Sequence, residues 1–103
     1  MKRILPFFLL ICSCSIFAQE KFQLAPPLLK YSSVFFSGKT AIEIKFAQKG
    51  AVVHYTLNNN EPTVQDPVYH NPIPISKNFT TVKAKAFGEQ FIPSATAAVT
   101  FIK

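Results

Sequence analysis

The sequence predicts an all-β protein, a small antiparallel β-sandwich of about seven short strands. Three observations lead to this prediction. Short runs of alternating apolar and polar residues recur along the chain, turn residues separate them, and no window shows the apolar spacing of an amphipathic helix. Eight prolines and an aromatic content of 14% also favour short strands over helices.

The first residues have the character of an export signal. Lys2 and Arg3 form a positively charged start, residues 4–11 are almost entirely apolar, and Ala18 offers a small residue at a cleavage site. This arrangement predicts a secretory signal peptide over residues 1–18. The apolar run is shorter than the roughly 20 residues that span a bilayer, which argues against a membrane helix.

A lipid anchor is the alternative for the same segment. Residues 11–14 read Ile-Cys-Ser-Cys and resemble a bacterial lipobox, in which Cys14 would carry the lipid. Cleavage near Ala18 predicts a secreted, periplasmic or cell-surface protein of the bacterial envelope, whereas a lipidated Cys14 predicts a membrane-anchored lipoprotein. Both cysteines lie in this leader, so the mature domain is expected to have no disulfide and no cysteine ligands for zinc.

The rest of the chain is long enough for one domain. We assign residues 19–24 to an N-terminal extension and residues 25–103 to the sandwich. Without Lys2 and Arg3 the basic residues number 11 − 2 = 9 against five acidic ones, a net charge of +4. These charges are dispersed, so we do not expect nucleic acid as a partner.

The residue pattern in the first half of the domain predicts an extended lead-in segment followed by three strands. Residues 23–27 enter extended, because consecutive prolines cannot donate hydrogen bonds to a sheet. Strands are expected within residues 28–36, 40–46 and 51–57, with turns at the glycines between them. Alternation places one set of side chains inward: Ile42, Ile44, Phe46, Val53, Tyr55 and Leu57. It places Glu43, Lys45, His54 and Thr56 outward.

The next segment predicts a turn followed by an edge element. Residues 58–60 are three asparagines, which tolerate positive φ and hydrogen-bond to their own backbone. Prolines at 67, 72 and 74 keep the following segment from forming a central strand. Tyr69, Ile73 and Ile75 are still expected to fill the core from an edge.

The last two strands are expected over residues 80–87 and 97–102. In the first, alternation places Val82, Ala84 and Ala86 inward and two lysines, Lys83 and Lys85, outward. In the second, Val99 and Phe101 face inward.

One stretch of the chain makes the fold more specific. Residues 55–63 read Tyr-Thr-Leu-Asn-Asn-Asn-Glu-Pro-Thr, and Tyr69, Pro72-Ile73, Thr81-Val-Lys-Ala-Lys-Ala86 and Ser94 follow in order. In this order and spacing the chain resembles the immunoglobulin-like module at the C-terminus of chitobiases and β-hexosaminidases, also called the fibronectin-III-associated domain. The resemblance covers roughly residues 25–102. It departs at residues 58–59, where Asn-Asn replaces the usual Asp-Gly, which puts any role of the Asp side chain in doubt.

The resemblance implies an immunoglobulin-like or fibronectin-III-like sandwich with a non-catalytic accessory role. In such enzymes the module packs beside a separate catalytic barrel, and no barrel lies within these 103 residues, so hydrolase activity is not carried over. The matching positions, all expected to be structural, are Tyr55, Thr56, Asn58, Asn59, Pro62, Tyr69, Pro72, Ile73, Val82, Ala84, Ala86 and Ser94.

The residue types also argue against catalysis. Glycoside hydrolysis needs two carboxylates across a cleft, and the acids here lie on outward faces or beside turns, where Glu61 is expected to brace the turn. His54 and His70 have no nearby acid partner in the sequence, and the three glycines form no phosphate loop. We therefore expect no enzymatic activity, no cofactor and no metal.

The remaining functional candidates are two kinds of binding. The first is an exported interaction module that contacts a protein or envelope partner. The alternative is a carbohydrate-binding module that acts with a separate glycoside hydrolase, and exposed aromatic rings would be its platform. We expect Phe46, Tyr55, Phe87 and Phe101 in the core. The rings that could be exposed are Tyr31, Phe35, Phe36 and Phe91, and of these we take Tyr31 and Phe91 as the candidate ligand contacts.

Overall fold

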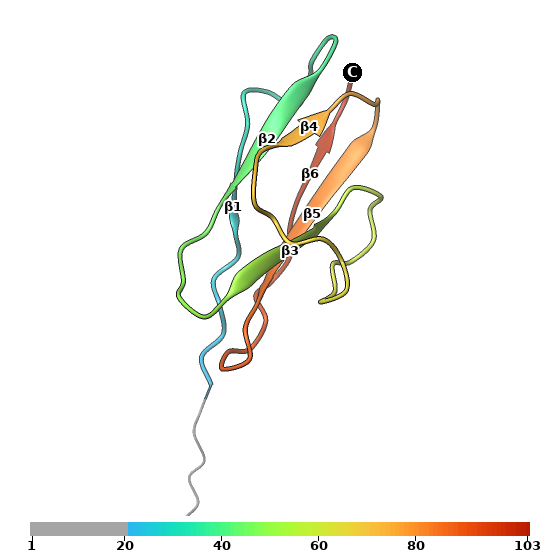
Figure 1. Ribbon diagram of the computed structural model, residues 1–103. Coiled ribbons are helices and arrows are strands. Elements are labelled where there is room, and N and C mark those ends of the chain that lie inside the picture. Colours follow the sequence, from blue (N-terminus) through green and yellow to red (C-terminus); the bar gives the residue numbers. More distant parts are fainter. Residues whose placement is uncertain (1–20) are drawn as a thin grey trace, which may run out of the picture.

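The computed structural model describes residues 21–103, which contain six strands joined by loops and no helix (Figure 1). They are β1 (Leu28–Lys30), β2 (Thr40–Lys45), β3 (Val52–Thr56), β4 (Ile73–Ile75), β5 (Thr80–Phe87) and β6 (Ala97–Phe101). The all-β prediction is confirmed. The lead-in over residues 23–27 adds only one bridge, between Gln23 and Ile92, because two prolines within it lack N–H groups. The predicted cleavage at Ala18 and the lipid on Cys14 lie outside the described residues.

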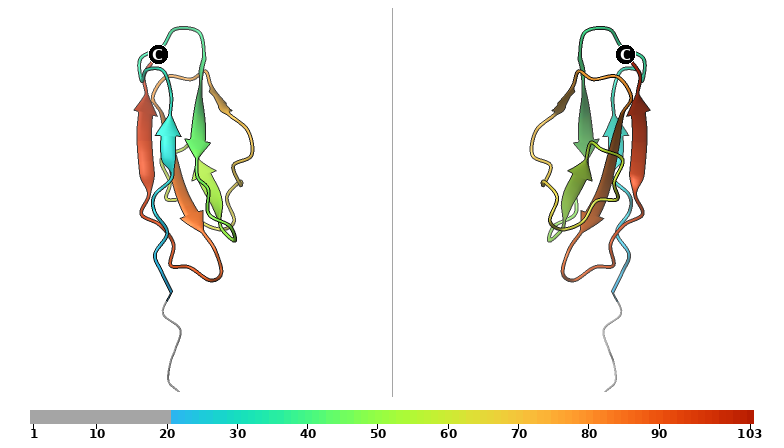
Figure 2. Two further views of the ribbon diagram at one scale, coloured as in Figure 1. Left: turned by 90° about the vertical axis from the view of Figure 1, so that its left-hand side faces the viewer. Right: turned by 90° about the vertical axis from the view of Figure 1, so that its right-hand side faces the viewer.

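The strands form two three-stranded antiparallel sheets that face each other as layers (Figure 2). One sheet has the order β1-β2-β4 and the other the order β3-β5-β6. Within the second sheet β5 pairs with β6 over residues 80–84 and with β3 over residues 83–87, so its two halves pair on opposite sides. Among residues 21–103 no helix is long and apolar enough to cross a membrane.

The core lies between the two sheets, where the alternating positions meet. Its buried side chains are Leu24, Ile42, Ile44, Val53, Ile73, Ile75, Val82, Ala84, Ala86 and Phe101. These include the inward isoleucines, valines and alanines expected from β2, β3 and β5. Burying each isoleucine contributes about 1.5–3 kcal/mol, so this face accounts for much of the stability.

Two inward assignments from the sequence were wrong. Leu57 is exposed, because β3 ends at Thr56 and the chain turns away from the core there. Phe87 lies on the outer face of β5, not in the core, since it follows the fully buried Ala86 and shares the parity of Lys85.

The outer face of β3 is covered rather than open to solvent. His54 and Thr56 occupy outward positions, as expected, yet both are buried. The loop after β3 returns across this face, where Asp66 O accepts from His54 Nδ1 at 2.7 Å and Asn60 O accepts from Thr56 Oγ1 at 2.6 Å. The sequence pattern sets the parity of a strand position but not what covers it.

The returning segment then crosses from one sheet to the other. Tyr69 N–H donates to Val53 O at 2.8 Å, and Tyr55 N–H donates to Pro67 O at 3.1 Å, which adds the segment to the edge of β3. Beyond Tyr69 the chain changes layer and pairs as β4 with β2. The prediction that prolines confine this segment to an edge is confirmed.

Segments before β2 are hydrogen-bonded to the second sheet near both of its ends. Leu24 N–H donates to Ile92 O at 2.9 Å, and Ile102 N–H donates to Val34 O at 2.7 Å. Leu24 is buried in the core, so the described part of the expected extension packs against the domain.

Candidate functional site

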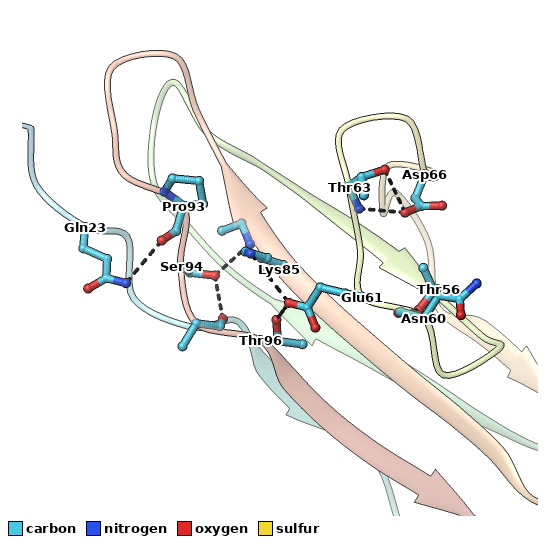
Figure 3. A network of polar contacts seen from close by, with 12 residues as sticks. Gln23, Thr56, Asn60, Glu61, Thr63, Asp66, Lys85, Pro93, Ser94 and Thr96 are labelled. Carbon is cyan, nitrogen blue, oxygen red and sulfur yellow. Dashed lines mark hydrogen bonds and ion pairs between the residues drawn. The ribbon is translucent and has the colours of Figure 1, made fainter.

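The covering loop over residues 57–67 is held in place by its own turn. Asn59 adopts a left-handed φ of 71°, and Asn60 N–H donates to Asn58 Oδ1 at 3.2 Å. The expectation that asparagine replaces glycine in this turn is therefore confirmed. Thr56 Oγ1 donates to Asn60 O at 2.6 Å, and the Pro62 side chain is fully buried (Figure 3). The loop is thus a fixed part of the outer surface.

Glu61 joins this loop to β5 and to the residue before β6. Its Oε2 accepts a hydrogen bond from Thr96 Oγ1 and lies 3.6 Å from Lys85 Nζ (Figure 3). The Thr96 hydroxyl, with a smaller contribution from Lys85, holds the pKa of the Glu61 carboxyl below its ordinary value. Glu61 is therefore ionised at neutral pH and braces the loop, as the sequence suggested.

Ser94 is a buried connection at the end of β5. Its Oγ accepts from Ala86 N–H and donates to Ala95 O, both at 2.8 Å, while Ser94 N–H donates to Ala86 O at 3.0 Å (Figure 3). The sequence alone did not predict these hydrogen bonds, and Ser94 was named only because it matches the family resemblance.

His54 carries its proton in a defined position. Its Nδ1 lies 2.7 Å from the backbone O of Asp66, and because a carbonyl oxygen only accepts, Nδ1 is the donor. The imidazole meets the Phe87 ring edge-on, with centroids 5.3 Å apart. Both rings are therefore held on the outer face of the sheet.

These two rings line a hollow that we call the outer groove, of about 280 Å3. Its members are Val52, His54, Val64, Phe87, Gly88, Glu89 and Pro93. Val64 is 63% exposed, and Lys85 Nζ lies 5.6 Å from the Phe87 ring centroid at the rim. The arrangement can accept an apolar group beside the Lys85–Glu61 ion pair. The alternation of β5 could have predicted that Phe87 faces outward. Nothing in the sequence around Val64 predicts that it lies beside Phe87.

Tyr31 and Phe91, the ring platform expected from the sequence, lie far apart. The Tyr31 ring meets Phe101 edge-on with centroids 5.4 Å apart, opposite the start of β5. Phe91 follows the end of β5, is half-buried, packs against the core and lines a hollow of about 620 Å3 near the N-terminal segment. An eight-residue strand separates the two rings by roughly 20 Å.

Among residues 21–103 the acidic side chains do not converge on one another. Glu43 pairs with Lys45 at 3.0 Å, and Asp66 Oδ2 accepts from Thr63 N–H at 2.7 Å. Within residues 21–103 there is no group of three His, Cys, Asp or Glu side chains that could hold a metal.

Most of the residues that carry the family resemblance are buried or hydrogen-bonded. Ile73, Val82, Ala84 and Ala86 are core residues, and Tyr55 and Tyr69 are packed against the core. Pro72 is exposed where the chain passes between the sheets.

One comparison with known proteins found a match. The sequence model of one family, described as the chitobiase/beta-hexosaminidase C-terminal domain, matches residues 32–99. No curated protein and no solved structure matches the chain.

Proposed function

We propose that this chain, which belongs to the chitobiase/beta-hexosaminidase C-terminal domain family, is an exported, non-catalytic accessory module that binds a protein partner of the envelope. The observation that carries the proposal is the outer groove, an open hollow lined mainly by apolar side chains on the outer face of the second sheet. Exposed apolar surface rimmed by polar residues can mark a protein interaction site.

The size of the groove favours a protein partner. Pockets for drug-sized ligands are commonly about 300–1,000 Å3 and enclose most of the ligand. The outer groove is slightly smaller than this range and open on one side. It suits one apolar side chain of a partner, with the Lys85–Glu61 pair offering polar contacts at the rim.

The engagement of the polar groups supports a non-catalytic role. Glu61 and Asp66 brace the covering loop, and Ser94 bridges backbone groups. General acid–base catalysis needs such groups free and within reach of one substrate. Release of nitrophenol from aryl glycosides by the purified protein would contradict this part of the proposal.

A matched pair of variants tests the groove. Val64→Glu places a charge in the groove, and Leu28→Glu makes the same change at a residue of β1 with nearly equal exposure, 65% against 63%. The immobilised protein is used to capture partners from an envelope extract, and each captured protein is purified and titrated. We expect binding to survive Leu28→Glu and to fall at least tenfold, or about 1.4 kcal/mol, with Val64→Glu. Equal binding by both variants would remove the groove as the contact.

Carbohydrate binding is the second candidate, and the Phe87 ring in the groove favours it. A ring beside Lys85 and Glu89 offers both an apolar face and hydrogen-bonding groups. Calorimetric titration with soluble oligosaccharides, chitin oligomers among them, tests this alternative on Phe87→Ala, Tyr31→Ala and Phe91→Ala. Glycan binding that Phe87→Ala abolishes, with no protein captured, would replace the first proposal with the second.

Export is proposed from the leader sequence. Mass spectrometry of the mature N-terminus distinguishes cleavage after Ala18 from a lipid anchor on Cys14. A chain beginning at Gln19 supports cleavage, whereas a lipid-modified Cys14 makes the protein membrane-anchored.

A further inference from the structure

A second apolar surface lies at the other end of β5 from the outer groove. Phe35 and Phe79 are 67% and 69% exposed, and neither lines the outer groove. The loop before β2, the loop between β4 and β5, and residue 103 come together at this end (Figures 1 and 2).

Strand pairing and a hydrogen bond place the two rings on either side of Ile102. Phe35 forms a parallel bridge with Ile102 on one side of β6. On the other side Thr80 lies opposite Phe101, and the turn that holds Phe79 is tied to this end of β6, because Asn78 Oδ1 accepts from Lys103 N–H. Phe79, Ile102 and Phe35 thus lie on three neighbouring segments of the chain, a row roughly 10 Å across. We call this row the end strip.

The ring of Phe79 is displayed by a fixed loop. Phe79 has a left-handed φ of 56°, which is uncommon for a bulky side chain. Hydrogen bonds hold the turn: Lys103 N–H donates to Asn78 Oδ1 at 2.8 Å, and Thr80 Oγ1 donates to Lys77 O at 2.8 Å. An exposed phenylalanine in a strained, tightly held turn is a reason to look for a function.

Three lysines lie on the chain segments at the same end, close to Ser76. Lys77 follows Ser76, Lys103 Nζ donates to Ser76 O at 3.2 Å, and Lys39 continues the β2–β4 pairing next to it. The acidic side chains of residues 21–103 lie elsewhere. Glu43 is within β2, Glu61 and Asp66 are in the covering loop, and Glu89 follows β5. The end that carries the exposed rings is therefore also positively charged.

We infer that this end of the sandwich docks on an anionic lipid surface. Protruding aromatic rings can enter the boundary between headgroups and acyl chains, while lysines around them attract anionic headgroups. Three lysines at this end, with no acidic side chain of residues 21–103 beside them, favour this occupant over a protein partner. This docking uses a different surface from the outer groove, and it needs no lipid on Cys14.

Vesicle co-sedimentation tests the inference with the mature protein, carrying Cys14→Ser if that position bears lipid. The probes are vesicles of phosphatidylcholine alone and vesicles that also contain phosphatidylglycerol. We expect binding only to the anionic vesicles and weaker binding at high salt. Lys77→Ala should weaken binding on the order of fivefold.

Two phenylalanine variants separate the role of the strip from folding. Phe79→Asn suits the left-handed φ and should keep the melting temperature, yet it should weaken vesicle binding at least tenfold. Phe22→Ser, at a residue 77% exposed near the opposite end, is the matched control and should bind like the wild type. Absence of wild-type binding, equal binding to neutral vesicles, or binding unchanged by Phe79→Asn would each overturn the inference. The inference would also be overturned if Phe79→Asn abolished capture of a protein partner but left vesicle binding unchanged.

Discussion

Ser94→Ala should lower the free energy of unfolding by about 2 kcal/mol. Ser94 is 2% exposed, and its hydroxyl accepts from Ala86 N–H and donates to Ala95 O. Without the hydroxyl, Ala86 N–H is left unpaired in a fully buried position, which costs about 1–3 kcal/mol. Ala95 is exposed, so its carbonyl can bind water at little cost.

The expected loss is large for a domain of this size. A chain of this length has a total stability of about 4–12 kcal/mol. A loss of about 2 kcal/mol corresponds to a fall of roughly 8–16 °C in Tm. Because the chain has no tryptophan and three tyrosines, urea unfolding is best followed by far-UV circular dichroism and tyrosine fluorescence.

A control and a second readout make this prediction specific. Ser32→Ala, at an exposed serine, should leave the unfolding midpoint unchanged. Hydrogen exchange at the Ala86 amide should become faster in Ser94→Ala. The reasoning is refuted if Ser94→Ala lies within about 0.5 kcal/mol of the wild type and the Ala86 amide stays protected.

Three further substitutions test the core, the loop brace and a close backbone approach. Ile44→Asp should prevent folding, because an unpaired charge in the core costs several kcal/mol, whereas Lys83→Glu should change little; the opposite result in thermal melts would mean that the strand faces are reversed. The pKa of the Glu61 carboxyl is lowered from 4.5 in the folded state, mainly by the hydrogen bond from Thr96. The ionised carboxylate therefore stabilises the fold fully above pH 4.5, and this stabilisation is lost as the pH falls through the lowered pKa. Melting temperatures between about pH 5 and pH 3 should therefore fall less in Glu61→Gln than in the wild type, and identical acid profiles would contradict the brace. Gly88→Ala should destabilise by about 1–3 kcal/mol, because a Cβ there would lie 2.7 Å from Gly50 O; an unchanged denaturation midpoint would show that the backbone yields freely.

The strands and most of the core can be predicted from the sequence alone. Alternation identified Ile42, Ile44 and Val82 as inward residues, because successive side chains of a strand point to opposite faces. Proline confined β4 to an edge, and Asn59 took the left-handed turn position. These features follow from local sterics and period, which a single sequence displays directly.

The contacts and the burial of each outward side chain follow from the tertiary structure and cannot be read from the strand period. His54 is outward by parity yet buried, because the loop that follows β3 returns across it. The outer groove needs that loop to bring Val64 beside Phe87, and the end strip needs the end of β6 to lie between two distant segments. Such surfaces depend on long-range pairing and on the path of the loops. The periodicity of a strand carries no information about either.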